Sequence, residues 1–156
     1  MEINQNRIKE MLELYKPEAR VLINGQVEYP VLRGEFKIQP TFYTTSHLEH
    51  VADIEIQLCL NQLVYAGLSQ AIEGKVLPEL NGLNFQELQR EGCLIIESRK
   101  KFRRPIKTDF PIRGDIIIND FGIHQNLILG HAKFDFENRS CIGDLTLALI
   151  KKSTLA

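Results

Sequence analysis

The sequence predicts an α+β fold in which one long helix lies inside a curved antiparallel sheet. Three observations indicate this fold class. Residues 50–73 run without proline, and their apolar side chains fall on nearly every side of a helix, so other elements must enclose it. A strand or hairpin pattern precedes this segment, and four consecutive strand patterns follow it. That order is expected when a single sheet curls around a single helix.

The composition favours one domain with no global charge bias. The 156 residues suit a single core, and we expect a helix within residues 1–17 to pack on a domain formed by residues 18–156. Nineteen Lys and Arg nearly balance twenty Asp and Glu, which argues against nucleic acid as a partner. No apolar run reaches the roughly 18 residues of a membrane span, and no signal peptide is visible. We therefore expect a cytoplasmic protein.

Before the central helix, the pattern changes from helical to alternating. Apolar residues at helical spacing between Ile8 and Tyr15 predict a short amphipathic helix that Pro17 ends. From residue 19 to residue 39, β-branched residues alternate with polar ones, and Asn24-Gly25 and Pro30 interrupt the pattern. This segment predicts one or two strands with a turn.

The central helix carries one polar stripe and ends at a glycine. We expect the stripe to face solvent or a partner subunit; its members are Glu55, Gln62, Ser69 and Glu73. Gly74 follows the last helical residue and suits the left-handed position of a helix C-cap.

The second half of the chain has the sequence pattern of a β-sheet. A connector over residues 75–91 contains a short helical turn, and strands are predicted over residues 93–102, 114–121, 127–137 and 142–150. A half-open sheet of this kind leaves exposed edges, which proteins commonly pair across a two-fold axis. We therefore expect a homodimer or an oligomer built from dimers.

The segment His50-Val-Ala-Asp-Ile-Glu55, followed by the Cys-x-Asn-Gln pattern at residues 59–62 and by Tyr65, resembles the central helix of FcoT-like hotdog thioesterases. The resemblance implies the hotdog fold, whose layout is a long central helix wrapped by a curved antiparallel sheet. It also implies a fatty acyl substrate carried as a thioester on coenzyme A or acyl carrier protein. No cofactor is then needed beyond the coenzyme A or phosphopantetheine that belongs to the substrate.

The same resemblance leaves the reaction open. Hydrolysis by a thioesterase is the simplest reading, and a lyase that adds water or an amine such as glycine to an enoyl thioester is the alternative. The family carries an Asn two residues after the motif His, whereas this chain has Ala52 there and Asp53 beside it. Either Asp53 has taken over that role or the chemistry differs. A non-catalytic acyl-binding domain is a third hypothesis.

Hotdog enzymes hold the thioester carbonyl near the N-terminal end of the central helix, where unpaired N–H groups stabilise an oxyanion. His50 and Asp53 lie at that end here and are the candidate bases, although Asp53 also suits a simple N-cap. Asn61 joins them as a catalytic candidate through the resemblance. The candidates for contact with substrate are Tyr43, His47, Gln62 and Tyr65.

A basic run, Arg99-Lys-Lys-Phe-Arg-Arg104 with Lys107 beyond it, stands out in a near-neutral chain. Arg103 and Arg104 are candidates for binding the phosphates of coenzyme A or the acidic face of a carrier protein. The alternative is that these charges lie on a solvated edge strand and prevent its aggregation with other chains. The chain has three separated cysteines and no convincing metal-ligand cluster, so we expect neither disulfides nor a metal, and we interpret Cys59 as a core residue.

Overall fold

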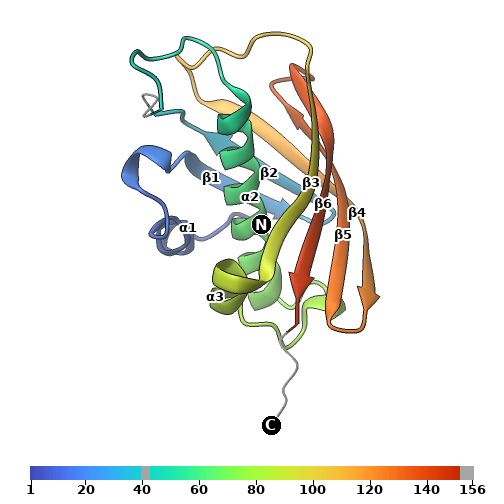
Figure 1. Ribbon diagram of the computed structural model, residues 1–156. Helices are drawn as coiled ribbons and strands as arrows, with labels where there is room; N and C mark the ends of the chain where they lie inside the picture. The colour runs from blue at the N-terminus through green and yellow to red at the C-terminus, as the bar shows by residue number, and fades with distance from the viewer. Residues whose placement is uncertain (40–42, 152–156) are drawn as a thin grey trace.

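A six-stranded antiparallel sheet curves around one long helix in the computed structural model, which describes residues 1–39 and 43–151 (Figure 1). The helices are α1 (Gln5–Leu12), α2 (Asp53–Glu73) and the single turn α3 (Phe85–Glu87). The strands are β1 (Leu22–Glu28), β2 (Val31–Phe36), β3 (Cys93–Phe102), β4 (Ile112–His124), β5 (Leu127–Phe136) and β6 (Cys141–Ile150). The predicted fold class is confirmed.

The strands lie in the order β1-β2-β4-β5-β6-β3, so β1 and β3 are the two edges of the sheet. The N-terminal residues cover the first edge, because Glu2 bridges to Gln26 and the N–H of Ile3 donates to the carbonyl of Gly25. At the other edge, no described strand pairs with the outer side of β3, which runs beside α2 (Figure 1). Within residues 1–39 and 43–151 the long β3 edge is therefore open.

Helix α2 is enclosed, as its sequence predicts. Its residues Ile56, Leu60 and Leu63 have no measurable exposure to solvent. Gly67 allows a close approach between α2 and the sheet, because a Cβ atom at this position would overlap the side chain of Leu32 on β2. Burial of this apolar surface is the main driving force for the fold.

The prediction that the polar stripe of α2 faces solvent or a partner subunit is wrong for three of its four members. Glu55, Gln62 and Ser69 are all buried within the chain, and only Glu73 is exposed. Each buried group has a partner, as buried polar groups must. Ser69, for example, accepts a hydrogen bond from the guanidinium of Arg7 on α1, which ties α1 to α2.

One of the two predicted interruptions in the first strand segment is confirmed, because the chain reverses at Tyr29-Pro30 between β1 and β2. The other is wrong, because Asn24-Gly25 lies inside β1, where the pairing with β2 is irregular. The prediction for Gly74 also needs correction. Gly74 has a right-handed φ of −74°, and the left-handed position falls one residue later, at Lys75. Among the described residues, none of the helices is both long and apolar enough to cross a bilayer.

Candidate active site

An open cleft of ≈ 630 Å³ borders the first turn of α2. Two segments line it, His50–Asp53 on one side and Phe102–Pro105 on the other. Four candidates from distant parts of the sequence therefore meet at one place: His50, Asp53, Arg103 and Arg104. The cleft opens to the surface.

Backbone pairing between two loops fixes the position of His50. His50 and Lys107 form an isolated antiparallel bridge. On either side of it, the N–H of Val51 donates to the carbonyl of Ile106 at 2.8 Å, and the N–H of Thr108 donates to the carbonyl of Glu49 at 3.2 Å. The loop before α2 and the loop after β3 thus form one small ladder that holds both walls of the cleft.

Helix α2 begins at Asp53, and Ala52 occupies its N-cap position. Ala52 has no side-chain acceptor, and only one half of a capping box is present: the buried carboxylate of Glu55 reaches back and accepts from the N–H of Ala52 at 2.7 Å. Tyr43 also hydrogen-bonds to Glu55, and partial desolvation together with this bond raises the pKa of Tyr43 to about 12. Asp53 is left free of the capping role and lies on the cleft, with its side chain 70% exposed.

A hydrogen-bonded chain leads from Asp53 into the protein. The ammonium group of Lys100 on β3 lies 3.5 Å from Oδ1 of Asp53, and it donates to Oε1 of Gln57 at 2.8 Å and to Oγ of Ser98 at 3.0 Å. Nε2 of Gln57 in turn donates to Oδ1 of Asn61 at 3.1 Å. Asn61 is two helical turns beyond Asp53, and this chain is its link to the cleft.

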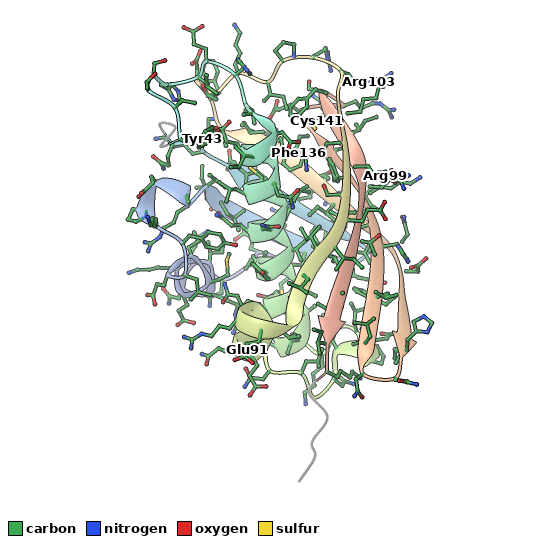
Figure 2. The ribbon with its side chains drawn as sticks, viewed as in Figure 1. Tyr43, Glu91, Arg99, Arg103, Phe136 and Cys141 are labelled. Carbon is green, nitrogen blue, oxygen red and sulfur yellow. The ribbon has the colours of Figure 1, made fainter. Side chains whose placement is uncertain are left out.

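A β-bulge explains why Lys100 points inward. The pairing of β3 with β6 shifts register between Ile95 and Glu97. Beyond this shift, the residues that face inward and those that face outward are exchanged relative to strict alternation. Beyond the shift, Lys100 lies on the inner face and its side chain is only 11% exposed. Arg99 lies on the outer face, pointing away from α2 (Figure 2). The predicted basic run is therefore divided between the two faces of the sheet.

The remaining predicted site residues lie outside the cleft. His47 is exposed and its Nε2 lies 3.3 Å from the hydroxyl of Thr108. Tyr65 is half-buried, and its hydroxyl donates to the carbonyl of Cys93 at the start of β3. Gln62 is fully buried, and both ends of its amide bind backbone atoms at the entry to β1, so nothing in its surroundings favours contact with substrate.

Three residues near the cleft were not selected from the sequence as catalytic or binding candidates. Glu55 was assigned to a stripe facing solvent or a partner subunit, although Glu at the third helical position is the usual partner of an N-cap. Lys100 was counted as one charge of a basic run. Phe102 follows Lys100 on the inner face by alternation, and it lines the cleft as a residue that is 39% exposed.

Cys141 on β6 lies beneath the cleft, near Lys100 and Asp53, and Figure 2 shows it at the same end of the molecule as Arg103. Desolvation raises the pKa of its thiol to about 11, although the charge of Lys100 opposes this shift. Burial likewise raises the pKa of Cys59 well above its usual value. Both residues are thiols at neutral pH and are poor nucleophiles.

All three cysteines are free thiols. Within residues 1–39 and 43–151, no group of three His, Cys, Asp or Glu side chains is arranged to hold a metal ion.

Comparison with known proteins identifies relatives in both sequence and structure. The model of the FcoT-like thioesterase domain matches residues 10–149. A (2E)-enoyl-[ACP] glycyltransferase from Mycobacterium marinum is 32% identical over 76 residues, which is 47% of this chain and 41% of that protein. The alignment thus spans about two fifths of the relative's length.

Two solved structures illustrate the likeness in fold. Thioesterase superfamily member 2 from zebrafish superposes with a TM-score of 0.59 at 10% identity, covering 93% of this chain and 94% of that one. A sigma28-regulated virulence protein from Campylobacter jejuni superposes with a TM-score of 0.54 at 11% identity, covering 96% of this chain and 89% of that one. At such low identity the likeness establishes the hotdog fold alone.

Proposed function

The chain belongs to the FcoT-like thioesterase domain family, and from this premise we propose that it hydrolyses a fatty acyl thioester at the first turn of α2. One observation carries the proposal: His50, Asp53, Arg103 and Arg104 line a single cleft at the N-terminus of an enclosed helix. In that arrangement an acid–base pair, a positive helix end and a phosphate-binding group lie within reach of one bound thioester.

The mechanism follows from the properties of a helix start. The first N–H groups of an α-helix have no acceptors within the helix. The carboxylate of Glu55 takes the N–H of Ala52, and the next two, from Asp53 and Ile54, are placed to stabilise the oxyanion that forms on the thioester carbonyl. Asp53 or His50 removes a proton from water as the water oxygen bonds to the carbonyl carbon. When the tetrahedral intermediate collapses, the C–S bond breaks, and the same group returns the proton to sulfur so that the thiol departs.

The position of Asp53 suggests which residue replaces the polar group that is missing at position 52. The family's polar residue is missing at position 52, where Glu55 accepts only from the backbone N–H, and the exposed carboxylate of Asp53 faces the cleft. This geometry supports the reading in which Asp53 has taken over the missing polar role.

The experiment is a thiol-release assay with the purified chain on octanoyl to octadecanoyl thioesters of coenzyme A and of acyl carrier protein. Release of thiol above the uncatalysed rate supports the proposal. Tight acyl binding without any turnover would replace it with a non-catalytic acyl-binding domain.

Addition of an amine to an enoyl thioester is the second candidate function. It is favoured by the matched segment of the M. marinum protein, whose name specifies glycyl transfer to a (2E)-enoyl-[ACP]. Mass spectrometry of an enoyl-carrier substrate, incubated with and without glycine, separates the two reactions. Hydrolysis removes the acyl group from the carrier, whereas addition leaves the thioester intact and raises its mass by that of glycine.

Arg103 and Arg104 are proposed to bind the phosphates of coenzyme A or acidic groups of a carrier protein. We expect the double change R103E and R104E to raise KM at low salt by at least tenfold, because a charge-assisted hydrogen bond contributes about 1.5–3 kcal/mol. The difference should shrink as salt screens the charges. R90E, an exposed arginine next to α3, is the matched control. An unchanged KM at low salt would rule out the binding role proposed for both arginines.

We also propose that the chain forms a homodimer through the open edge of β3. This edge carries two large exposed apolar residues, Leu94 at 52% and Ile96 at 55%. We expect sedimentation equilibrium to give twice the chain mass, and I96K to shift the protein toward monomer. I123K alters an equally exposed isoleucine on β4 and should leave the dimer intact. A monomeric wild type would reject this assembly.

A further inference from the structure

The carboxylate of Asp53 is restrained by one contact. Asp53 is the first residue of α2, it lines the cleft, and its side chain is 70% exposed. An exposed side chain of this kind can sample several staggered rotamers. Within residues 1–39 and 43–151, the partner of this carboxylate is the ammonium group of Lys100, which lies 3.5 Å from Oδ1. The contact with Lys100 therefore decides where the carboxylate points.

Lys100 is itself held in place. Its side chain is only 11% exposed, and its ammonium group donates to Oε1 of Gln57 at 2.8 Å and to Oγ of Ser98 at 3.0 Å. An ammonium group has three donors, so these two bonds leave one donor for Asp53. Lys100 is thus the fixed member of the ion pair, and the exposed carboxylate adjusts to it.

The position of Lys100 sets the direction in which the carboxylate is drawn. Lys100 lies on the inner face of β3, and Phe102, the next residue on that face, belongs to the wall of the cleft opposite Asp53. An ion pair with Lys100 draws the carboxylate away from bulk solvent and toward that wall. Asp53 is thereby directed into the cleft.

Stability alone does not account for Lys100. Its ammonium group is largely withdrawn from water and close to the positive end of α2, and both conditions are unfavourable for a cation. An ion pair with an exposed carboxylate contributes little to stability in return, because water screens it. Locally unfavourable choices of this kind are expected at functional sites.

We propose that Lys100 is a positioning residue that orients the carboxylate of Asp53 toward a water molecule in the cleft. This inference rests on the proposed function, in which Asp53 is a candidate for the group that removes a proton from that water. Lys100 does not itself line the cleft, so it acts on the reaction through Asp53. Without it, the carboxylate would spend less time in the geometry that proton transfer requires.

Lys100→Met tests the role of the ammonium group, because it keeps the length of the side chain and removes the charge. We expect kcat for acyl-thioester hydrolysis to fall by about 10- to 100-fold, the usual effect of a misplaced catalytic group. KM and the melting temperature should stay close to wild type. Lys101→Met makes the same change at the next residue, which is exposed on the outer face of β3, and should leave kcat unchanged.

Two further variants separate positioning from a merely structural role. If Lys100 acts through Asp53, then D53N already removes what Lys100 contributes, and the double variant D53N/K100M should be no slower than D53N. K100R keeps a cation beside Asp53 and should retain more activity than K100M. Losses that multiply in the double variant, together with a lowered melting temperature, would overturn the inference in favour of a structural ion pair.

The rotamer of Asp53 can be measured without any turnover, which separates this inference from the proposed function. Nuclear magnetic resonance couplings between the Hα and Hβ protons of Asp53 should indicate one rotamer in the wild type and in K101M, and averaging over rotamers in K100M. If the wild type released no thiol from any acyl thioester, the proposed hydrolysis would fail, and these couplings would still test the role of Lys100. Averaged couplings in the wild type, or wild-type kcat in K100M, would overturn the inference.

Discussion

Asp53→Asn should lower kcat for acyl-thioester hydrolysis by about 10²–10⁴-fold, the usual contribution of a general acid or base. The reason lies in the position of this carboxylate. It is exposed on the cleft, it adjoins the helix N–H groups proposed to hold the oxyanion, and the ammonium group of Lys100 lies 3.5 Å away. The amide of Asn preserves size and polarity but does not accept a proton from water.

Stability measurements can separate this catalytic effect from damage to the fold. Removing a negative charge from the first turn of a helix costs typically 0.3–1 kcal/mol, which leaves the chain folded. Asp109→Asn makes the same change at an exposed position in the loop after β3, and its turnover should match wild type. If D53N kept more than half of the wild-type kcat, His50 would have to be the base.

The enclosed helix and the succession of strands along the chain were predictable because burial leaves a periodic pattern in the sequence. Apolar residues such as Ile56, Ala66 and Leu68 lie on different sides of α2 and are all buried, whereas an amphipathic surface helix buries only one stripe. His50 and Asp53 could be placed at one end of this helix by counting residues, and the family resemblance supplied the meaning of that end. Local periodicity was sufficient for these features.

The burial of the polar stripe could not be predicted, because a polar residue does not reveal whether its partner is water or another group of the chain. Glu55 satisfies the helix start, and Ser69 receives Arg7 from a helix some 60 positions earlier. Gln62 binds a segment about 40 positions away. Partners so distant along the chain are set by tertiary packing, and periodicity carries no trace of them.

Lys100 was missed because of the bulge in β3. Strict alternation from Cys93 would place Arg99 inside and Lys100 outside. The register shift between Ile95 and Glu97 reverses that assignment, and no residue type in the segment predicts the shift. A single extra residue in the ladder thus decides which lysine reaches α2, and only the three-dimensional pairing contains that information.

Gln62→Ala should destabilise the fold by about 4 kcal/mol, although this residue was first selected from the sequence as a substrate contact. Its Oε1 accepts from the N–H groups of Val21 and Leu22 at 3.0 Å each, and its Nε2 donates to the carbonyl of Ala19 at 2.7 Å. Removal of the side chain leaves three buried backbone groups without partners, each costing about 1–3 kcal/mol before any relaxation.

Thermal unfolding measures this loss directly, with an expected fall in melting temperature of about 8–16 °C for a domain of this size. Gln62→Met keeps the volume and removes the hydrogen bonds, so it should retain most of the loss and separate the bonds from the cavity. Gln86→Ala at an exposed position should change stability by no more than about 0.5 kcal/mol. A substrate contact would show the opposite pattern, with turnover lowered in Q62A at wild-type stability. Because Gln62 joins the middle of α2 to the start of β1, such a result would mean that the helix is held against the sheet by apolar packing alone.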